Sequence, residues 1–451
     1  MTMPSRRHRV VVAESKDKRL GEKSVDQLKL FDDDSRFTNR RVKSVTFQGK
    51  LDLPIHRWYR LTPSFSPELA IDIADHFKLG PDDLVLDPFS GVATVPLCMK
   101  YRGIPASSVE INPYLFFVGT VKTRTYRNVN AIEACLQEFM NQLRRTFHLL
   151  PKGEGINGYL VEHAAFIPRI NFPERWWSPS NLMQLVCLRQ VVDNYQAEPD
   201  HHDLLKMGVL GILVSVSNAK HNHVSLTFAD EPAGTLDVLS ILEKKYGEML
   251  KDLQGLYSQP SSEVTIYQGN SKQVSKILPE GSKVSAVITS PPYPNRFSYA
   301  RETRPHLFFF DFIEDARAVG ELEVQAIGGT WGRATSILSG GVVPANPLIE
   351  RLLTPYTKNI HDEGQLMAHY ITKYFNDIYQ HAGEIARVVR HRCQLAYVIG
   401  NSKFYGHPLP SDEILAAIFG HFGFRLDRID RMRRRQSKTG LYEAIVFMRR
   451  D

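Results

Sequence analysis

Residues 84–94 are Leu-Val-Leu-Asp-Pro-Phe-Ser-Gly-Val-Ala-Thr, and this stretch decides the fold of the 451-residue chain. Its three leading apolar residues are typical of a short strand that is buried on both faces. A turn containing glycine follows, and the apolar pattern of residues 95–101 predicts a helix directly after it. Residues 106–109 predict a second strand, which ends at Glu110. Strand, turn, helix and strand in this order predict the start of a doubly wound α/β sheet.

The other parts of this sheet are predicted before and long after the deciding stretch. A helix is expected over 66–78, with Ser66 as its N-cap, Pro67 in its first turn and Gly80 at its end. Further strands are expected at 264–267, 284–288, 394–399, 424–432 and 442–448. The last two should form a terminal antiparallel pair, and a long helix is expected near 365–389.

Four regions follow from this pattern and from the charges. Residues 1–45 contain 12 lysines and arginines against seven acids. They predict a flexible basic arm, which either is simply solvated or contacts the phosphates of a nucleic acid. The first half of the sheet is expected in 46–121 and the second half in 263–451. The region between them, 122–262, is predicted to be a mostly helical insertion.

The composition is that of a folded globular protein, with 43% hydrophobic and 23% charged residues. The net charge of +7 permits a polyanionic partner. Four widely separated cysteines without a nearby histidine cluster predict no metal site and no disulfide framework, which favours a reducing cytoplasm. The longest apolar stretch, 207–216, is shorter than the about 20 residues of a membrane span, so no membrane segment is expected. The basic residues at the N-terminus are not followed by an apolar core, so no signal peptide is expected.

The turn after the first strand is the first candidate binding site. A turn that opens a helix points backbone N–H groups outward, and Gly91 allows a ligand to approach the main chain. The carboxylate of Asp87 suits a cationic group, such as an ammonium or a sulfonium, better than a phosphate. Glu110 ends the next strand, where an acid can accept hydrogen bonds from ribose hydroxyls. In the alternative interpretation neither residue binds a ligand: Asp87 caps a helix, and Glu110 is exposed at the end of a strand.

The second candidate site is the sequence Thr-Ser-Pro-Pro-Tyr at 289–293. Proline fixes the backbone and donates no hydrogen bond, so the loop presents acceptors in a fixed row. The Ser290 hydroxyl and the Pro291 carbonyl could accept both N–H bonds of an exocyclic amine, while Tyr293 stacks on the base. The tetrapeptide Ser-Pro-Pro-Tyr is also found in surface turns and in proline-rich partner motifs. Its place at the end of a buried strand favours the amine-binding interpretation.

Taken together, these motifs resemble those of the S-adenosylmethionine-dependent amino-methyltransferases of DNA, which methylate cytosine N4 or adenine N6. Residues 87–94 resemble the family's cofactor motif, Asp-Pro-Phe-x-Gly-x-Gly-Thr, and Glu110 resembles its ribose-binding acid. Residues 289–293 resemble its catalytic loop in the form that is commonest among N4-cytosine enzymes. The resemblance covers about 50–120 and 264–450. It implies a Rossmann-like methyltransferase fold, S-adenosyl-L-methionine as cofactor and double-stranded DNA as partner.

The resemblance also implies roles for individual residues. Phe65 lies in a segment that resembles the one closing over the methionine part of the cofactor, and Asn270 lies in one that resembles a Gly-Asp-Ala/Ser turn near the adenine. The implied cofactor-binding residues are Phe65, Asp87, Phe89, Gly91, Thr94, Glu110 and Asn270. The implied catalytic residues are Ser290, Pro291, Pro292 and Tyr293. The chain departs from the family where Ala93 replaces the second glycine and Asn270 replaces the acid, and its motif order is the reverse of that in many such enzymes.

Contacts with DNA are expected after the catalytic loop and near the C-terminus. The expected DNA-binding residues are Arg296, Tyr299, Arg301, Arg433, Arg434 and Arg435. In the C-terminal group, the seven basic residues between 425 and 438 face only Asp427 and Asp430 within this stretch. Recognition of bases is expected from the insertion together with residues 294–360. Arginines on a solvated helix would look the same, and the large aromatics Trp176, Trp177 and Trp331 fit a core or interface better than a wedge between bases.

The expected function is site-specific methylation of the exocyclic amine of a flipped base, with cytosine N4 first and adenine N6 second. A guanine-N2 methyltransferase of RNA comes third, and a non-catalytic nucleic-acid-binding relative is the alternative from another class. No Pro-Cys dipeptide occurs, which argues against methylation at carbon 5, and no phosphate-binding Gly-x-x-x-x-Gly-Lys motif occurs. The sequence leaves open the recognition site, the oligomeric state and a restriction or phage-defence partner.

Overall fold

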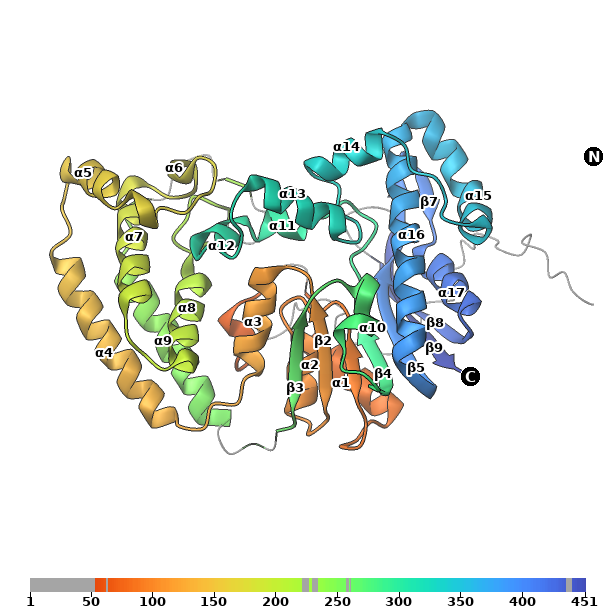
Figure 1. Cartoon of the computed structure of the whole chain (residues 1–451), viewed down its shortest axis with the longest axis horizontal. Helices are drawn as coiled ribbons and strands as arrows, with labels where there is room; N and C mark the ends of the chain where they lie inside the picture. Colours follow the sequence, from red (N-terminus) through yellow and green to blue (C-terminus); the bar gives the residue numbers. More distant parts are fainter. Residues whose placement is uncertain are drawn as a thin grey trace, which may run out of the picture. The chain divides into compact units, whose positions relative to one another are not determined.

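The computed structural model describes residues 53–61, 64–220, 227–228, 234–256, 259, 261–434 and 440–451, with the backbone alone at 433 and 434. The predicted basic arm, 1–45, and Arg435 lie outside the described residues. Figure 1 shows the arrangement of the helices and strands.

A seven-stranded sheet forms the centre of the fold, in the order β3-β2-β1-β4-β5-β9-β8. The first five strands pair in parallel, and β9 pairs antiparallel with both β5 and β8. The strands are β1 (Val85–Asp87), β2 (Ala106–Glu110), β3 (Val264–Gln268), β4 (Val284–Thr289), β5 (Val389–Gly400), β8 (Phe424–Arg434) and β9 (Tyr442–Arg450). The predicted α/β class, the strands and the terminal antiparallel pair are therefore confirmed.

The strand order brings the ends of three strands together. From β1 the chain moves outward in one direction to β2 and β3, whereas β4 lies on the other side of β1. Asp87 of β1 stands opposite Ser108 of β2, and Leu86 stands opposite Val287 of β4. Because the order reverses at β1 and β4, a crevice is expected outside their carboxyl ends.

Helices cover both faces of the sheet. On one face, α1 (Pro67–Phe77) and α2 (Thr94–Lys100) pack against apolar side chains of β1 and β4. On the other face lie α10 (Val274–Ile277), α16 (Gln365–Val388) and α17 (Ser411–His421). The Ser66 hydroxyl accepts from the Leu69 backbone N–H, as expected for the N-cap of α1. The helix ends at the left-handed residue Lys78, not at Gly80, because Lys78 N–H already closes the last turn.

The region between β2 and β3 is helical, as predicted. It contains α3 (Pro113–Thr123), α4 (Val129–His148), α5 (Gly155–Glu162), η4 (Ala164–Phe166), α6 (Pro173–Trp176), α7 (Pro179–Asn194), α8 (Pro199–Ile212) and α9 (Val238–Leu256). These helices share one apolar core, in which Trp177 is fully buried and donates from Nε1 to the Leu213 carbonyl. Trp176 is also buried, so both are core residues.

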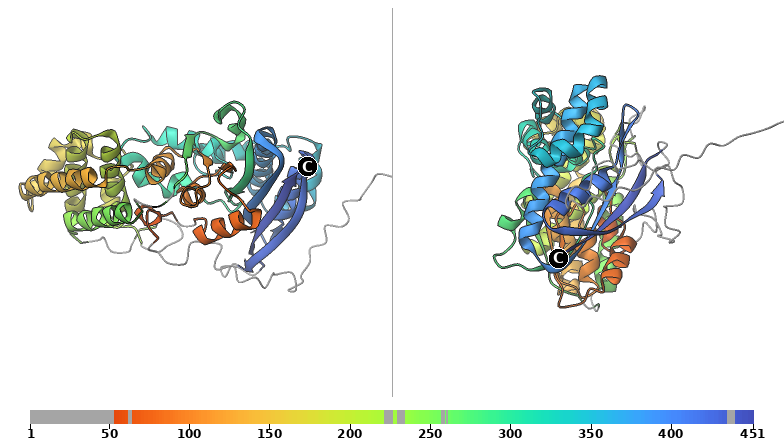
Figure 2. Two further views of the ribbon diagram at one scale, coloured as in Figure 1. Left: turned by 90° about the horizontal axis from the view of Figure 1, so that it is seen from below. Right: turned by 90° about the vertical axis from the view of Figure 1, so that its right-hand side faces the viewer.

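The chain that follows β4 connects the sheet with this helical core. Its helices are α11 (Tyr299–Glu302), α12 (Arg304–Phe309), α13 (Ala316–Gln325), α14 (Arg333–Ser339) and α15 (Pro347–Glu363). Leu307, Phe308 and Phe309 of α12 belong to the same apolar core as α4 and α7. A small hairpin of β6 (Ser402–Phe404) and β7 (His407–Leu409) follows β5. Figure 2 shows the long β8–β9 pair beside α1, where Phe77 packs edge-on against Phe447.

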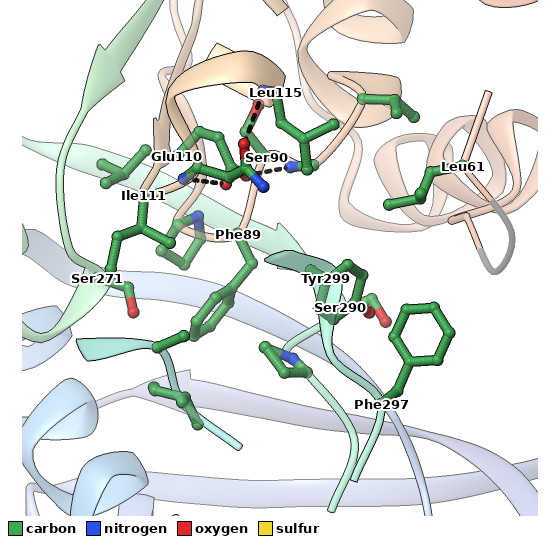
Figure 3. Close-up of a pocket in the computed structure, with 18 of the residues that line it drawn as sticks. Leu61, Phe89, Ser90, Glu110, Ile111, Leu115, Ser271, Ser290, Phe297 and Tyr299 are labelled. Carbon is green, nitrogen blue, oxygen red and sulfur yellow. Dashed lines mark hydrogen bonds between the residues drawn. The ribbon is translucent and has the colours of Figure 1, made fainter. Parts of the chain in front are cut away.

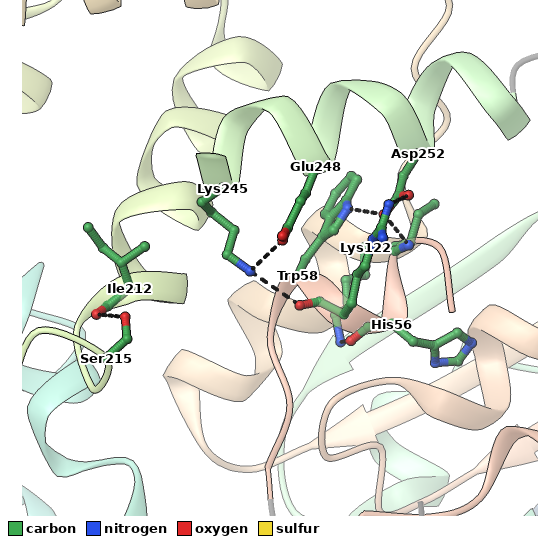
Figure 4. A network of polar contacts seen from close by, with 10 residues as sticks. His56, Trp58, Lys122, Ile212, Ser215, Lys245, Glu248 and Asp252 are labelled. Carbon is green, nitrogen blue, oxygen red and sulfur yellow. Dashed lines mark hydrogen bonds and ion pairs between the residues drawn. The ribbon is translucent and has the colours of Figure 1, made fainter. Parts of the chain in front are cut away.

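A short segment around η3 (His56–Trp58) is held from two sides (Figure 4). On one side, Asp252 of α9 accepts from the Ile55 backbone N–H at 2.9 Å and from Trp58 Nε1 at 3.0 Å. On the other, the fully buried Lys122 of α3 donates from Nζ to the Tyr59 carbonyl at 2.6 Å and to the Val92 carbonyl at 3.3 Å. Burial and nearby positive charges lower the pKa of Lys122 to about 7.

Candidate active site

A cavity lies at the carboxyl ends of β1, β2 and β4 (Figure 3). Its wall comes from segments that are far apart in the sequence. All the expected cofactor-binding residues line it, namely Phe65, Asp87, Phe89, Gly91, Thr94, Glu110 and Asn270. Ser290, Pro292 and Tyr293 line the same cavity, whereas Pro291 is buried outside the lining. The structure therefore brings the two candidate sites into one space.

Asp87 joins these two sites directly. Its buried carboxylate accepts from the Thr289 hydroxyl at 2.6 Å and from the Phe89 backbone N–H at 3.1 Å. Burial raises the pKa of Asp87 to about 6, although both hydrogen bonds oppose the rise. Because Thr289 immediately precedes Ser290, this carboxylate fixes the start of the catalytic-loop candidate relative to the turn after β1.

Glu110 holds the same turn from the neighbouring strand. Its Oε2 accepts from the Gly91 backbone N–H at 2.7 Å, and its Oε1 accepts from the Asn112 backbone N–H at 2.8 Å. Burial and the charge of Asp87 raise the pKa of Glu110 to about 7, against these hydrogen bonds. A carboxylate oxygen can accept more than one hydrogen bond, so both oxygens retain capacity for hydroxyl donors of a ligand.

The turn between Asp87 and Thr94 leaves room for a ligand. Gly91 has a φ of 53°, and a Cβ added there would meet no other atom within 4 Å. The Ser90 hydroxyl is buried and has no hydrogen-bond partner among the described residues. Ala93 has a φ of 62°, which costs an L-residue about 1–2 kcal/mol relative to a right-handed conformation. The open space and the unused hydroxyl fit a bound molecule with polar groups.

The catalytic-loop candidate is fixed by contacts on both sides. The Ser290 hydroxyl donates to the Val398 carbonyl of β5 at 3.1 Å, which leaves its oxygen able to accept. The Pro292 carbonyl accepts from the hydroxyl of Tyr374, a fully buried residue of α16, at 2.7 Å. The side chain of Tyr293 is half-buried in the wall. Sequence reasoning missed Tyr374, since nothing near it in the sequence distinguishes it from a core aromatic.

Two further wall residues have contacts that the sequence did not reveal. Asn270 Oδ1 accepts from the Lys272 backbone N–H at 3.0 Å, and Nδ2 donates to the Gln325 carbonyl at 3.1 Å. One acceptor position of Asn270 is thus used within the chain. The ring of Phe89 packs at 4.8 Å from the ring of His381, whose burial lowers its pKa to about 4. His381 is therefore uncharged near neutral pH, and it supports the cavity wall by packing against Phe89.

Glu323 is the one buried residue of α13 and another residue that the sequence analysis missed. Its carboxylate accepts from the Ser298 hydroxyl, from the Thr330 N–H at 3.1 Å and from the Trp331 N–H at 3.3 Å. Ser298 in turn caps α11 by accepting from the Arg301 N–H. Glu323 thus joins the chain after the catalytic-loop candidate to the glycine-rich loop 328–332.

We expect Glu323→Ala to lower the free energy of unfolding by about 3 kcal/mol, because two backbone donors lose their acceptor at about 1–3 kcal/mol each. The matched control is Glu321→Ala on the same helix, which removes only an exposed ion pair with Arg333 and should cost about 0–1 kcal/mol. Urea unfolding of both variants measures the difference. Equal effects would show that Glu323 does not hold the two loops together.

The residues expected to contact DNA occupy different environments. Tyr299 lies in the cavity wall, where burial and the charge of Glu110 raise its pKa to about 12. Arg296 is exposed, and the guanidinium of Arg301 lies 4.5 Å from the ring of Trp331. Arg433 and Arg434 end β8, and nothing is described of their side chains. Arg435 is outside the described residues.

The C-terminal arginines form more ion pairs with carboxylates than the local sequence indicates. Within 425–438 their only acidic neighbours are Asp427 and Asp430, but folding adds carboxylates from other segments. Arg431 pairs with Asp412 and Glu413 of α17. Arg425 pairs with Asp427 and with Asp451. These ion pairs leave less positive charge on β8 for a polyanion than the local sequence suggests.

No protein-family model matches the chain. It is similar to the type II methyltransferase M.BsoBI of Geobacillus stearothermophilus, with 20% identity over 435 residues, 88% of this chain and 84% of the relative. The type II methyltransferases M.AvaI of a Nostoc species and of Anabaena variabilis are 23% identical over 440 residues, 91% of this chain and 86% of each relative.

Among solved structures, TrmN from Thermus thermophilus aligns with a TM-score of 0.29 and 8% identity, over 86% of this chain and half of its own length. The rRNA methyltransferase aviRa from Streptomyces viridochromogenes aligns with a TM-score of 0.29 and 9% identity, over 87% of each chain. The relatives found by sequence are thus methyltransferases, and they are matched over most of their length.

Proposed function

We propose that the chain transfers a methyl group from S-adenosyl-L-methionine to the exocyclic amine of a base in double-stranded DNA, with cytosine N4 as the leading target. The observation that carries this proposal is the hydrogen bond between Thr289 and Asp87. It joins the proposed cofactor turn to the proposed amine-binding loop within one cavity. The type II methyltransferases to which the chain is similar support the reaction class.

The residues of the turn after β1 fit the cofactor. Glu110 would accept hydrogen bonds from the ribose hydroxyls, and Phe65 and Phe89 would provide apolar contacts. The open space beside Gly91 and the unused Ser90 hydroxyl offer room and a further polar contact. Asp87 places a negative charge where a cationic ligand would benefit from it. When bound, the cofactor supplies an electrophilic methyl group on a sulfonium.

The loop at 290–293 would hold and orient the amine. The Ser290 hydroxyl would accept one amine N–H at its oxygen while it donates its own proton in a hydrogen bond to the Val398 carbonyl. Because Pro291 lies outside the lining, the Pro292 carbonyl would accept the other with its second lone pair, in place of the expected Pro291 carbonyl. Tyr374 fixes the loop through the same carbonyl. Accepting from both N–H bonds directs the nitrogen lone pair toward the methyl group, while Tyr293 stacks on the base.

The target base would have to leave the duplex, because an amine paired inside a helix cannot reach a wall at the ends of buried strands. The insertion and residues 294–360 flank the cavity segments in the chain and are the proposed source of sequence recognition.

The type II names of the relatives favour a restriction–modification setting with a partner nuclease. Among the described helices, none has the length and apolar character that crossing a membrane requires.

Nucleoside mass spectrometry of DNA from cells that express the protein tests this function. We expect N4-methylcytosine, and none in cells that express Ser290→Ala. N6-methyladenine instead would identify adenine, the second candidate, as the target base, because the same hydrogen-bond acceptors can bind either amine. A methylated guanine in RNA with unmodified DNA would contradict the proposal, and so would a protein that binds DNA but no S-adenosylmethionine.

Cofactor affinity should rise with pH between about 6 and 8. The pKa of Glu110 is raised to about 7, so the protonated acid, which offers fewer acceptors, dominates below this pH. Below the pKa, affinity should change by at most about tenfold per pH unit. The same raised pKa means that the folded protein loses stability as pH rises from about 4.5, the ordinary pKa of a glutamate, to about 7. Calorimetric titration of the wild type and of Glu110→Gln at each pH measures the effect, and an equal pH dependence in both would exclude Glu110 as its source.

A further inference from the structure

Three arginines from two parts of the chain have their guanidinium groups over aromatic rings. Arg175 of α6, in the helical insertion, lies 4.4 Å from the ring centre of Phe228. Arg304, at the start of α12, lies 5.9 Å from the ring of Trp176, and Arg301 of α11 lies 4.5 Å from the ring of Trp331. A guanidinium stacked on a ring keeps its N–H donors at its edge, where they can bind another group.

The three guanidinium groups form one cluster. The ring of Trp176 packs edge-on against that of Phe228 at 4.9 Å, which connects the rings under Arg304 and Arg175. Burial and the charges of Arg301 and Arg175 lower the pKa of Arg304, and Glu302 acts in the opposite direction. In Figure 1, α6 and the α11–α12 segment lie along the same side of the fold.

This cluster lacks the partners that the other arginine-rich surface has. Arg425, Arg428 and Arg431 of β8 each pair with a carboxylate. Within the described ranges, no ion pair is formed by any of the three arginines of the cluster, and the buried Nε of Arg304 has no hydrogen-bond partner. Positive groups gathered in this way repel one another in the free protein and would be stabilised by an anion.

The cluster also lies next to the proposed base-binding cavity. Arg301 directly follows Tyr299 and Ala300, which line the cavity. Trp331, whose ring lies under Arg301, is two residues after Gly329, which also lines the cavity. Glu323 holds the N–H groups of Thr330 and Trp331 and thereby fixes this edge. An anion bound here would therefore lie at the rim of the cavity.

We infer that Arg175, Arg301 and Arg304 bind a backbone phosphate of the DNA strand beside the flipped nucleotide. The inference rests on the proposed function. Phosphate is the fitting anion, because the planar fork of arginine donates two parallel hydrogen bonds to its oxygens. Since Arg175 belongs to the insertion and the other two to the chain after β4, the phosphate would join both parts of the protein to one point of the substrate.

The test compares Arg175→Gln, Arg304→Gln and the double variant with the control Arg333→Gln. Arg333 is exposed, lies two residues after Trp331 and is already paired with Glu321. DNA affinity is measured between about 50 and 200 mM salt, and the salt slope should fall by about 0.9 for a lost phosphate contact. We expect the double variant to bind DNA about tenfold more weakly at low salt. The control and the affinity for S-adenosylmethionine should be unchanged.

Thermal unfolding separates a binding role from a structural one. Removal of one charge from a repelling cluster should leave the Tm of the free protein unchanged or raise it, while DNA binding weakens. A lower Tm together with unchanged DNA affinity would overturn the inference. Arg304→Lys keeps the charge and should retain most of the salt slope, although it loses the paired donors.

A neutral methylphosphonate placed beside the target base provides the second measurement. The wild type should lose affinity for this DNA, and the double variant should lose no more. If the wild type methylates DNA but the double variant keeps its salt slope, the inference fails and the proposed function stands. If inorganic phosphate raises the Tm while the methylphosphonate has no effect, the cluster is a small-anion site and the inference is wrong. A wild type that does not methylate DNA contradicts the proposed function itself.

Discussion

Replacement of Glu110 by alanine should lower the affinity for S-adenosylmethionine by about 100-fold. The substitution would remove a charged hydrogen-bond partner of the ribose, which contributes about 1.5–3 kcal/mol in total. It would also release the Gly91 and Asn112 N–H groups that it now holds at 2.7 and 2.8 Å. Isothermal calorimetry on the purified protein measures the loss.

The matched control for this variant is Glu263→Ala. Glu263 is exposed and precedes β3, at the end of the sheet opposite the cavity. Its removal should leave cofactor affinity unchanged. If Glu110→Ala folds normally and binds the cofactor as tightly as the wild type, the cofactor site is somewhere else in the chain.

Replacement of Tyr293 by alanine should lower turnover on DNA by about ten- to a hundredfold. The ring would stack on the flipped base, and a base–aromatic stack contributes about 1–3 kcal/mol. Tyr293→Phe keeps the ring and should be nearly silent. Single-turnover methylation with saturating cofactor measures the rate, because it separates the chemical step from product release.

A second variant distinguishes the ring from its support. Tyr374→Phe removes the hydroxyl that donates to the Pro292 carbonyl at 2.7 Å, so the loop should be less fixed while Tyr293 remains. We expect a lower rate with nearly unchanged DNA affinity, as for an interaction that acts mainly in the transition state. Wild-type rates in both Tyr293→Ala and Tyr374→Phe would mean that 290–293 is only a surface turn.

The parts of the fold that local sequence determines were predicted well. The strands at 84–86 and 284–288 are short apolar runs buried on both faces, and such runs have few alternatives in a folded chain. The helix at 66–78 carries its own start signal in Ser66 and Pro67. Its end was misplaced, since Lys78 adopts a left-handed conformation that glycine more commonly adopts.

The parts of the site that depend on distant contacts could not be predicted. Tyr374 meets Pro292 only because α16 packs across the sheet, and Glu323 looks in the sequence like any glutamate on a solvated helix. The ion pairs of Arg431 could not be predicted for the same reason, because Asp412 and Glu413 come from α17. Sequence patterns identify the groups that can react, but the residues that hold them come from tertiary packing.

The segment around η3 limits how this protein can be rebuilt from modules. Asp252 of α9 binds Ile55 and Trp58, and Lys122 of α3 binds the carbonyls of Tyr59 and Val92. A chimera that exchanged only the helical insertion would leave these buried donors without their carboxylate. The natural unit of exchange is therefore the helical insertion together with residues 53–61, two stretches of the gene that would have to be transplanted as a pair.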